Sequence, residues 1–353
     1  MSISKITRIF FPLSLAVMVA SLAHAQSSAS APSDTGPYHV SQTFHVGDEG
    51  GWDYLTVDPE NKLLYVPRSS HTLVLDATTG KTVADIPGQK RNHGVAIVPS
   101  VGRGFITDGE DASVVIFDLK TYAVLGKVKA AADADGVIYD AASGKVLVVC
   151  GDAGVMVPIS ADVDLKTGKA DAAVDLGGKP EFLVADGAGK AYINLEDKDT
   201  VAVVDTKTMK VINKWPTAPG ASPVGMSMDR VHRRLFIGCR KPQRLIVMSA
   251  DNGNIFAGLP IGAGVDATAF NDGDAFASCR DGSLIVVRET TPGKFEVVQT
   301  VKTPTGARTM GVDPSTHTVY LPTAEFGPPA QGQTRPSTKP GSFMVVVVSP
   351  TGK

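Results

Sequence analysis

The chain has 353 residues, with 34 lysines and arginines against 36 aspartates and glutamates, and its formal net charge is −2. This near-neutral balance lacks the strongly basic character that is typical of a nucleic-acid-binding domain. The length would allow two domains, but no linker or change of composition divides the chain.

The first 25 residues predict a secretory signal peptide. Lys5 and Arg8 supply positive charge, Ile9–Leu22 forms an apolar core, and Ala23-His24-Ala25 is a cleavage box of small residues. An uncleaved membrane anchor is the alternative, but the apolar run is short for a span of about 20 residues. We therefore expect cleavage after Ala25 and a periplasmic protein. The mature charge is then −4, because 34 − 2 leaves 32 basic residues against 36 acidic ones.

Residues 179–215 contain four short strand patterns that turns join into one unit. Phe182–Ala185, Lys190–Asn194, Thr200–Val204 and Lys210–Trp215 are rich in strand-forming residues, and Gly, Asp and Asn separate them. They predict a four-stranded antiparallel meander. Such a unit cannot bury both of its faces alone, so further copies are expected.

The unit recurs along the chain with a period near 40 residues. Steps of 40, 42, 46, 43, 42 and 42 residues separate one repeat position, just before each first strand, which is occupied by Asp53, His93, Asp135, Glu181, Val224, Asp266 and Arg308. Four strands in a period of about 40 residues are typical of a β-propeller. Seven copies predict an all-β fold, a seven-bladed propeller of four-stranded antiparallel blades.

The two ends of the chain predict how the ring closes. The last copy ends with Phe343–Lys353 and has no fourth strand, whereas an unmatched strand, His39–Val46, precedes the first copy. This strand resembles fourth strands such as Thr82–Ile86. We expect it to complete the last blade, which leaves no open edge. Residues 38–353 then form the propeller, and the Ser-, Ala- and Pro-rich residues 26–37 form a flexible leader.

Three cysteines occupy equivalent places, each at the end of a second strand: Cys150, Cys239 and Cys279. An odd number in an exported protein leaves at least one unpaired. A disulfide between Cys239 and Cys279 is conceivable because their blades are adjacent. The favoured interpretation is three small buried side chains.

Blade geometry predicts which residues face a ligand. The first strand of each blade lines the channel, so the loops that precede it and the loops between second and third strands open on one rim, where we expect function. The Asp-x-x-Thr turns lie on the other rim and are structural. The functional rim supplies the polar candidates Asp53, Arg68, His93, Asp108, Asp135, Asp152, Glu181, Glu196, Arg240, Asp266, Arg280, Arg308 and Glu325.

These candidates predict a basic sector in blades one, five, six and seven, diluted by Asp53, Asp266 and Glu325, and an acidic sector in blades two to four. Ion pairs between neighbouring blades are the structural alternative. The loop Phe326–Ser342 is much longer than its counterparts, and it is either a lid over the mouth or disordered. Oxygen ligands from Asp53, Glu181 and Asp266, together with His93, could hold Ca²⁺ or Mg²⁺.

Several segments resemble the YVTN repeat: Lys62–Val66, Lys190–Ile193, Arg234–Ile237 and Thr318–Leu321. Each precedes a polar loop and then a strand, and the strand ends at an Asp-x-x-Thr-type turn in most copies. Residues 38–353 thus resemble an exported YncE-type seven-bladed propeller. Relatives of this shape include binding proteins, one type implicated in DNA binding, and lactonases and antibiotic lyases of similar architecture. No lyase or lactonase site of such relatives maps onto these positions.

Two functions fit the sequence. The first is a binding module for a small polar or anionic ligand, or for a partner protein, at the channel mouth. The second is a lactonase-like hydrolase or a lyase, with or without a metal, in which Glu181 or His93 is the base and arginines hold a carboxylate. The sequence shows no nucleophile motif with a paired base, which favours binding. DNA binding ranks third, because the basic residues are few.

Overall fold

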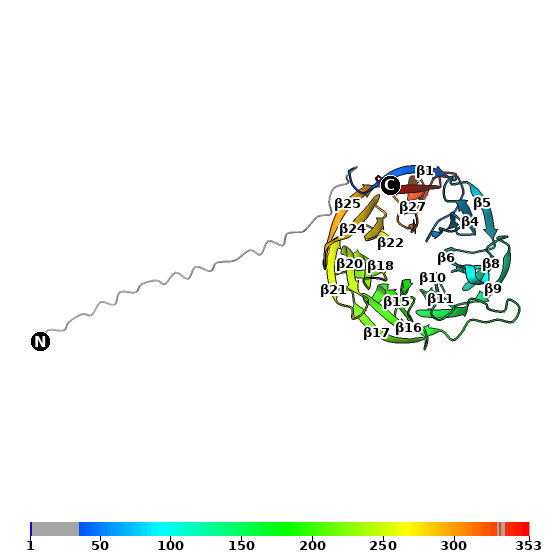
Figure 1. Cartoon of the computed structure of the whole chain (residues 1–353), viewed down its shortest axis with the longest axis horizontal. Helices are drawn as coiled ribbons and strands as arrows, with labels where there is room; N and C mark the ends of the chain where they lie inside the picture. The colour runs from blue at the N-terminus through cyan, green and yellow to red at the C-terminus, as the bar shows by residue number, and fades with distance from the viewer. Residues whose placement is uncertain (2–34, 330–331, 333–335, 353) are drawn as a thin grey trace.

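Seven sheets surround a central channel (Figure 1), and each contains four antiparallel strands. The computed structural model describes residues 1, 35–329, 332 and 336–352. The predicted signal peptide and most of the leader lie outside these residues. The all-β seven-bladed propeller predicted from the repeats is confirmed.

In the first six blades the strands follow the chain from the channel outward, and in the last blade the N-terminal strand is outermost. The inner strands are β2 (Thr56–Asp58), β6 (Asn92–Val98), β10 (Ala134–Asp140), β14 (Pro180–Ala185), β18 (Ala221–Asp229), β22 (Val265–Asn271) and β26 (Gly311–Asp313). The second strands are β3 (Leu63–Pro67), β7 (Arg103–Asp108), β11 (Lys145–Cys150), β15 (Lys190–Leu195), β19 (Arg234–Lys241), β23 (Asp274–Cys279) and β27 (Thr318–Thr323).

The outer half of each blade completes the sheet. The third strands are β4 (His71–Asp76), β8 (Ser113–Asp118), β12 (Val155–Ser160), β16 (Thr200–Asp205), β20 (Gln243–Ser249), β24 (Ser283–Thr291) and β30 (Met344–Pro350). The outermost strands are β5 (Thr82–Pro87), β9 (Val124–Lys129), β13 (Val174–Asp175), β17 (Lys210–Pro216), β21 (Ile255–Pro260), β25 (Lys294–Lys302) and β1 (Tyr38–His45). The remaining elements are a hairpin of β28 (Phe326–Pro329) and β29 (Pro336–Thr338) and the 3₁₀ turns η1 (Pro99–Val101) and η2 (Glu196–Lys198).

The N-terminal strand closes the ring, as expected. β1 pairs antiparallel with β30, so that Thr43 lies opposite Val346, and the sheet order of the last blade is β1-β30-β27-β26. Tyr38 also joins blade six, because its backbone N–H donates to Gln299 Oε1 at 2.9 Å and its carbonyl accepts from Gln299 Nε2 at 2.7 Å. This pairing satisfies the backbone N–H and C=O groups along the edge of β30, which would otherwise be exposed.

The hydrophobic core lies between the blades. Among the described residues, seven buried clusters each join two neighbouring blades. At the interface of blades four and five, for example, Val203 packs with Met226 and Ile237, and all three are almost fully buried. Burial of such side chains contributes about 1.5–3 kcal/mol each. The apolar strand patterns therefore stabilise the ring as a whole.

The Asp-x-x-Thr turns have the structural role that the sequence predicted. Asp76 Oδ1 accepts hydrogen bonds from the backbone N–H groups of Thr78 and Thr79 and from the Thr79 hydroxyl. The same pattern recurs at Asp118, Asp164 and Asp205. These bonds stabilise the turn between third and fourth strands.

The three cysteines are free and buried, which confirms the favoured interpretation. Burial raises the pKa of the Cys150 thiol to about 11 and the pKa values of the Cys239 and Cys279 thiols to about 12. These thiols are therefore protonated and unreactive at neutral pH.

Candidate functional site

A chain of ionisable side chains surrounds the mouth of the channel. His93 stands between two carboxylates, with Nδ1 at 2.7 Å from Asp53 Oδ2 and 3.6 Å from Asp135 Oδ1. These three residues come from blades one, two and three, and each occupies the repeat position singled out in the sequence. Because inner strands converge on the axis, residues 40 or more positions apart meet here.

The arginines continue this chain on the other side of the mouth. Arg308 contacts Asp266 and lies 3.9 Å from Asp53, measured from Nη1 to Oδ1. Arg240 also contacts Asp266. The same guanidinium reaches Glu196 at 3.0 Å and Glu181 at 3.7 Å. Asp53 and Asp266 thus lie among the basic residues, as the sequence places them, and Arg240 also reaches the acids of blade four.

An aromatic pair forms the floor beneath this ring. Tyr54, which follows Asp53, is 9% exposed and contacts Phe182 of blade four, with ring centroids 4.7 Å apart and ring planes at 51° to each other. Blades one and four lie on opposite sides of the ring (Figure 1), so the pair reaches across the channel. Burial raises the pKa of Tyr54 well above its usual value, with further contributions from the Asp135, Asp53 and Glu181 carboxylates. We call the part of the mouth above this aromatic pair the cup.

Two acids of the cup are held in an environment that favours their protonated forms. Burial raises the pKa of Asp135 well above its usual value, and the charges of Asp53 and Glu181 raise it further. Burial also raises the pKa of Glu181, and Glu196 adds to this while Arg240 opposes it. Perturbed acids in a cleft are typical of functional sites, although structural networks also produce them.

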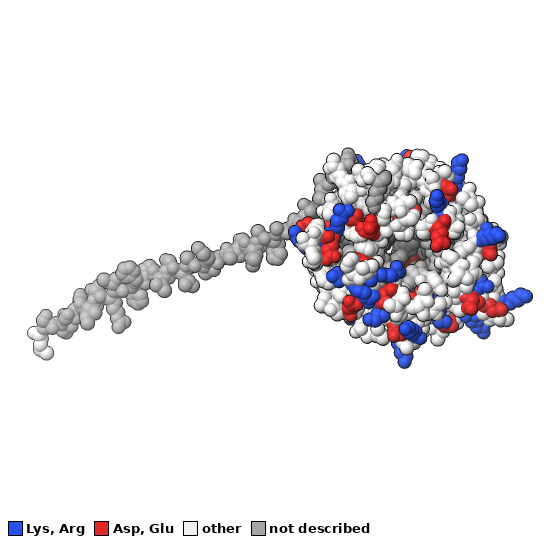
Figure 2. Space-filling view, viewed as in Figure 1, with Lys and Arg blue, Asp and Glu red and all other residues white. Residues whose placement is uncertain are grey.

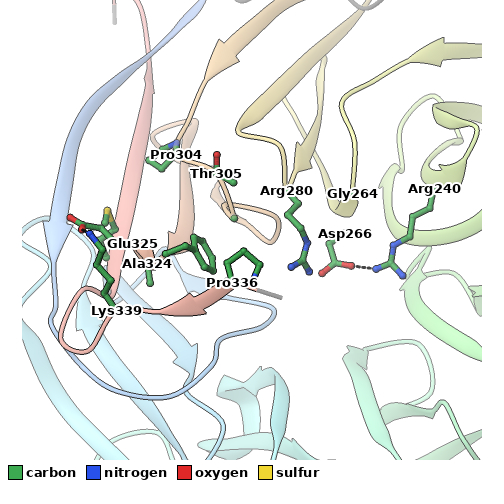
Figure 3. A pocket seen from close by; sticks show the side chains of 13 residues that line it. Arg240, Gly264, Asp266, Arg280, Pro304, Thr305, Ala324, Glu325, Pro336 and Lys339 are labelled. Carbon is green, nitrogen blue, oxygen red and sulfur yellow. Dashed lines mark hydrogen bonds and ion pairs between the residues drawn. The ribbon is translucent and has the colours of Figure 1, made fainter. Parts of the chain in front are cut away.

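A pocket of about 960 Å³ adjoins the cup between blades five, six and seven. Its charged lining residues are Arg240, Asp266, Arg280, Glu325 and Lys339, and its other lining residues are Gly264, Pro304, Thr305, Gly306, Ala324, Phe326, Pro336 and Met344. Figure 3 shows Arg240, Arg280 and Asp266 on one side and Pro336 facing them, and Phe326 also lines the pocket. The pocket thus combines a polar wall with an apolar one.

The hairpin β28–β29 provides the apolar wall. Phe326 is paired in register with Thr338, and Lys339 Nζ lies 2.9 Å from Glu325 Oε2. The backbone N–H of Gly341 donates to Glu49 Oε1 at 2.9 Å, which ties the hairpin to blade one. The long loop is thus an ordered hairpin over the mouth for its described residues, and residues 330–331 and 333–335 lie outside them.

Two predicted rim residues point away from the mouth. Arg68 is 1% exposed, lies 3.0 Å from Asp48, and stacks 3.5 Å from the centre of the Phe343 ring. Asp108 is fully buried, accepts a hydrogen bond from the Lys90 backbone at 2.9 Å, and lies 3.2 Å from Lys127 Nζ. Both therefore stabilise the framework, and neither belongs to the candidate ligand site.

The sequence did not identify several residues of the site. Tyr54 and Phe182 adjoin the repeat positions Asp53 and Glu181, so an aromatic residue beside the channel position was the available signal. Thr305 and Pro336 had no such signal, because they line the pocket only through the path of their loops.

Fold and site together define a seven-bladed β-propeller with a charged cup at one end. Figure 2 shows one face of the ring, hollowed near its centre, with acidic and basic side chains interspersed around the hollow. Among the described residues, no helix is long and apolar enough to cross a membrane.

Comparison with known proteins supports this class. The sequence matches no protein-family model and no curated protein. Streptogramin B lyase is similar in structure, with a TM-score of 0.68 and 12% identity over 88% of this chain and 97% of that one. The β-propeller domain of Cps50 (Swd1) from Myceliophteria thermophila has a TM-score of 0.67 and 12% identity over 89% and 100% of the two chains. At these identities the likeness concerns the fold.

Proposed function

We propose that the chain is an exported YVTN-type propeller that binds a small carboxylate with an apolar part in the pocket beside the cup. The observation that carries this proposal is that a charged wall and an apolar wall line opposite sides of one pocket. Arg240 and Arg280 from neighbouring blades line one side with Asp266, and Phe326 and Pro336 from the hairpin line the other. Guanidinium groups bind carboxylates through paired hydrogen bonds, and an apolar wall favours the rest of such a ligand.

The charges of the pocket support an anionic ligand. Asp266 contacts both Arg240 and Arg308, so one carboxylate faces two guanidiniums, and Arg280 lines the same wall. Among the lining residues, three cations, Arg240, Arg280 and Lys339, stand against the two acids Asp266 and Glu325. The volume of about 960 Å³ lies within the usual range for small-molecule sites.

Binding of benzoate, compared with neutral benzamide and with inorganic phosphate, tests the proposal by calorimetry. We expect benzoate to bind best. Arg280→Ala should weaken benzoate binding by about 2 kcal/mol, or roughly 30-fold, which is a typical loss for a charged hydrogen bond. Arg234→Ala, at the far rim where Arg234 covers the Phe256 ring, is the matched control and should leave binding unchanged.

Two results would contradict the proposal. If Arg280→Ala binds benzoate like the wild type and melts many degrees lower, Arg280 joins blades and the proposed site is wrong. Equal binding of benzamide and benzoate would exclude recognition of the carboxylate.

Catalysis in the cup is a second candidate function, and the raised pKa values of Asp135 and Glu181 beside His93 favour it. A carboxyl group with a raised pKa keeps its proton to a higher pH and can donate it to a leaving group. Streptogramin B lyase has a similar fold, so a propeller of this kind supports a lyase activity in another protein. Turnover of aromatic lactones that is lost in Glu181→Gln would support this function, and turnover unaffected by that substitution would exclude Glu181. The interspersed charges of the mouth give DNA binding no comparable support.

A further inference from the structure

A buried carboxylate oxygen in the cup has no hydrogen-bond partner. Asp135 is 9% exposed, and its Oδ1 makes no hydrogen bond in the described part of the chain. This oxygen points toward His93, whose Nδ1 lies 3.6 Å away, just beyond hydrogen-bonding distance. A buried polar atom without a partner is costly, so the arrangement indicates a missing ligand.

The neighbouring atoms have the spacing of a metal site. Ligand atoms from Asp53, His93 and Asp135 all lie within 4.8 Å of one another. A cation at about 2.0–2.2 Å from each of three ligands separates them by roughly 3–3.6 Å. The 2.7 Å and 3.6 Å distances from His93 Nδ1 to the two carboxylates bracket this range. Small side-chain rotations would therefore bring all three atoms onto one ion.

The charge of the cup also favours a cation. Two carboxylates, those of Asp53 and Asp135, flank His93 from either side. A dication between them would offset the mutual repulsion of these two acids.

We propose that Asp53, His93 and Asp135 bind a divalent first-row transition metal ion, for which Zn²⁺ is the probe. One imidazole with two carboxylates is a donor set that suits Zn²⁺ and its neighbours, whereas Ca²⁺ and Mg²⁺ prefer oxygen ligands alone. The set differs from the one expected from the sequence. Asp266 is held by Arg240 and Arg308, and Glu181 faces Arg240, so Asp135 takes their place.

This site stands apart from the proposed carboxylate pocket, because none of its three residues lines that pocket. Failure of benzoate to bind would leave the metal proposal intact, and the converse also holds. With three protein ligands, the ion would keep open positions for water or a ligand in the cup.

Calorimetric titration of metal-free purified protein with Zn²⁺ tests the proposal. We expect one tight site per chain and a higher melting temperature with Zn²⁺. Asp135→Asn preserves size and should lower the affinity more than about 100-fold, since loss of an outer hydrogen-bond partner alone costs 10–100-fold. Co²⁺ bound in place of Zn²⁺ should show visible absorption bands in the wild type, and His93→Ala should abolish them.

His232→Ala is the matched control, because His232 Nδ1 also lies 2.7 Å from a carboxylate, Asp229 Oδ2. That pair has a single acid and lies on the far rim, so the variant should bind Zn²⁺ like the wild type. The proposal fails if the wild type binds no Zn²⁺, if Asp135→Asn binds it equally tightly, or if His232→Ala loses the site instead. Tighter binding of Ca²⁺ than of Zn²⁺ would exclude the transition-metal class.

Discussion

Tyr54 of blade one contacts Phe182 of blade four across the channel, with ring centroids 4.7 Å apart and ring planes at 51° to each other. Tyr54 also belongs to the buried cluster that joins blades six and seven and contains Met310 and Ala267. One side chain thus links blades that share no strand.

Replacement of Tyr54 by alanine should lower the free energy of unfolding by about 3 kcal/mol, because a large aromatic side chain leaves a cavity at the axis. Tyr54→Phe should stay within about 1 kcal/mol of the wild type, since the ring is retained. Urea unfolding followed by circular dichroism measures both. Phe256→Ala serves as the control, because Phe256 is 39% exposed. If Tyr54→Ala costs no more than Phe256→Ala, the pair does not support the ring.

Deletion of residues 1–47 should cause aggregation or a large loss of thermal stability. The deletion removes β1 and leaves β30 with an open edge, which invites pairing between molecules. Calorimetry and light scattering measure the two effects. A chain that begins at Thr35 retains β1 and should melt like the mature protein. Equal melting temperatures for the two truncations would exclude closure by β1 as a source of stability.

Asp135→Asn should raise the melting temperature at neutral pH when no metal is present. The pKa of Asp135 is raised in the folded state, so this state binds more protons than the unfolded one. The wild type therefore loses stability as the pH rises from the unfolded pKa toward the folded pKa. The asparagine variant lacks this loss, and its advantage should disappear near pH 3, where the carboxyl is protonated in both states.

Asp76→Asn is a control for which the opposite dependence of stability on pH is expected. Hydrogen bonds from Thr79 hold the pKa of Asp76 below its usual value. Its stabilisation is therefore present at neutral pH and is lost as the pH falls through the folded pKa. Melting curves between pH 3 and pH 8 should show Asp76→Asn below the wild type at neutral pH. A lower melting temperature for Asp135→Asn at every pH would show that the Asp135 carboxylate stabilises the fold.

Mass spectrometry of the protein from its native host should find Gln26 as the first residue, after release by osmotic shock. The cleavage box and the short apolar core account for this expectation. A full-length chain that retains Lys5 and stays with the membrane fraction would show that the N-terminal segment is an anchor.

The repeats predicted the fold almost completely, because each strand is specified by local pattern. In blade four, the expected strands 182–185, 190–194, 200–204 and 210–215 differ from β14, β15, β16 and β17 by at most two residues at either end. Turn residues and alternating burial are local properties of the chain, and the number of copies determines the number of blades.

The site was less predictable, because a repeat position determines where the backbone lies and does not determine where the side chain points. Arg68 and Arg240 hold equivalent loop positions, yet Arg68 turns under Phe343 while Arg240 reaches Asp266. That difference depends on Asp48, which belongs to the loop before blade one and has no repeat counterpart. The sequence also did not show which acid neutralises which arginine, because Asp266 contacts arginines of two other blades, Arg240 and Arg308.

The pairing of β1 with β30 also bears on the order in which the ring assembles. Thr43 of β1 is made early in synthesis, and its partner Val346 is made near the end. Because a chain is made N-terminus first, β1 stays unpaired until the last blade is made. Ring assembly therefore ends with its longest-range contact, the slowest kind to form. A chain whose synthesis stops early lacks β30 altogether and cannot hide its first strand, which marks it for proteolysis.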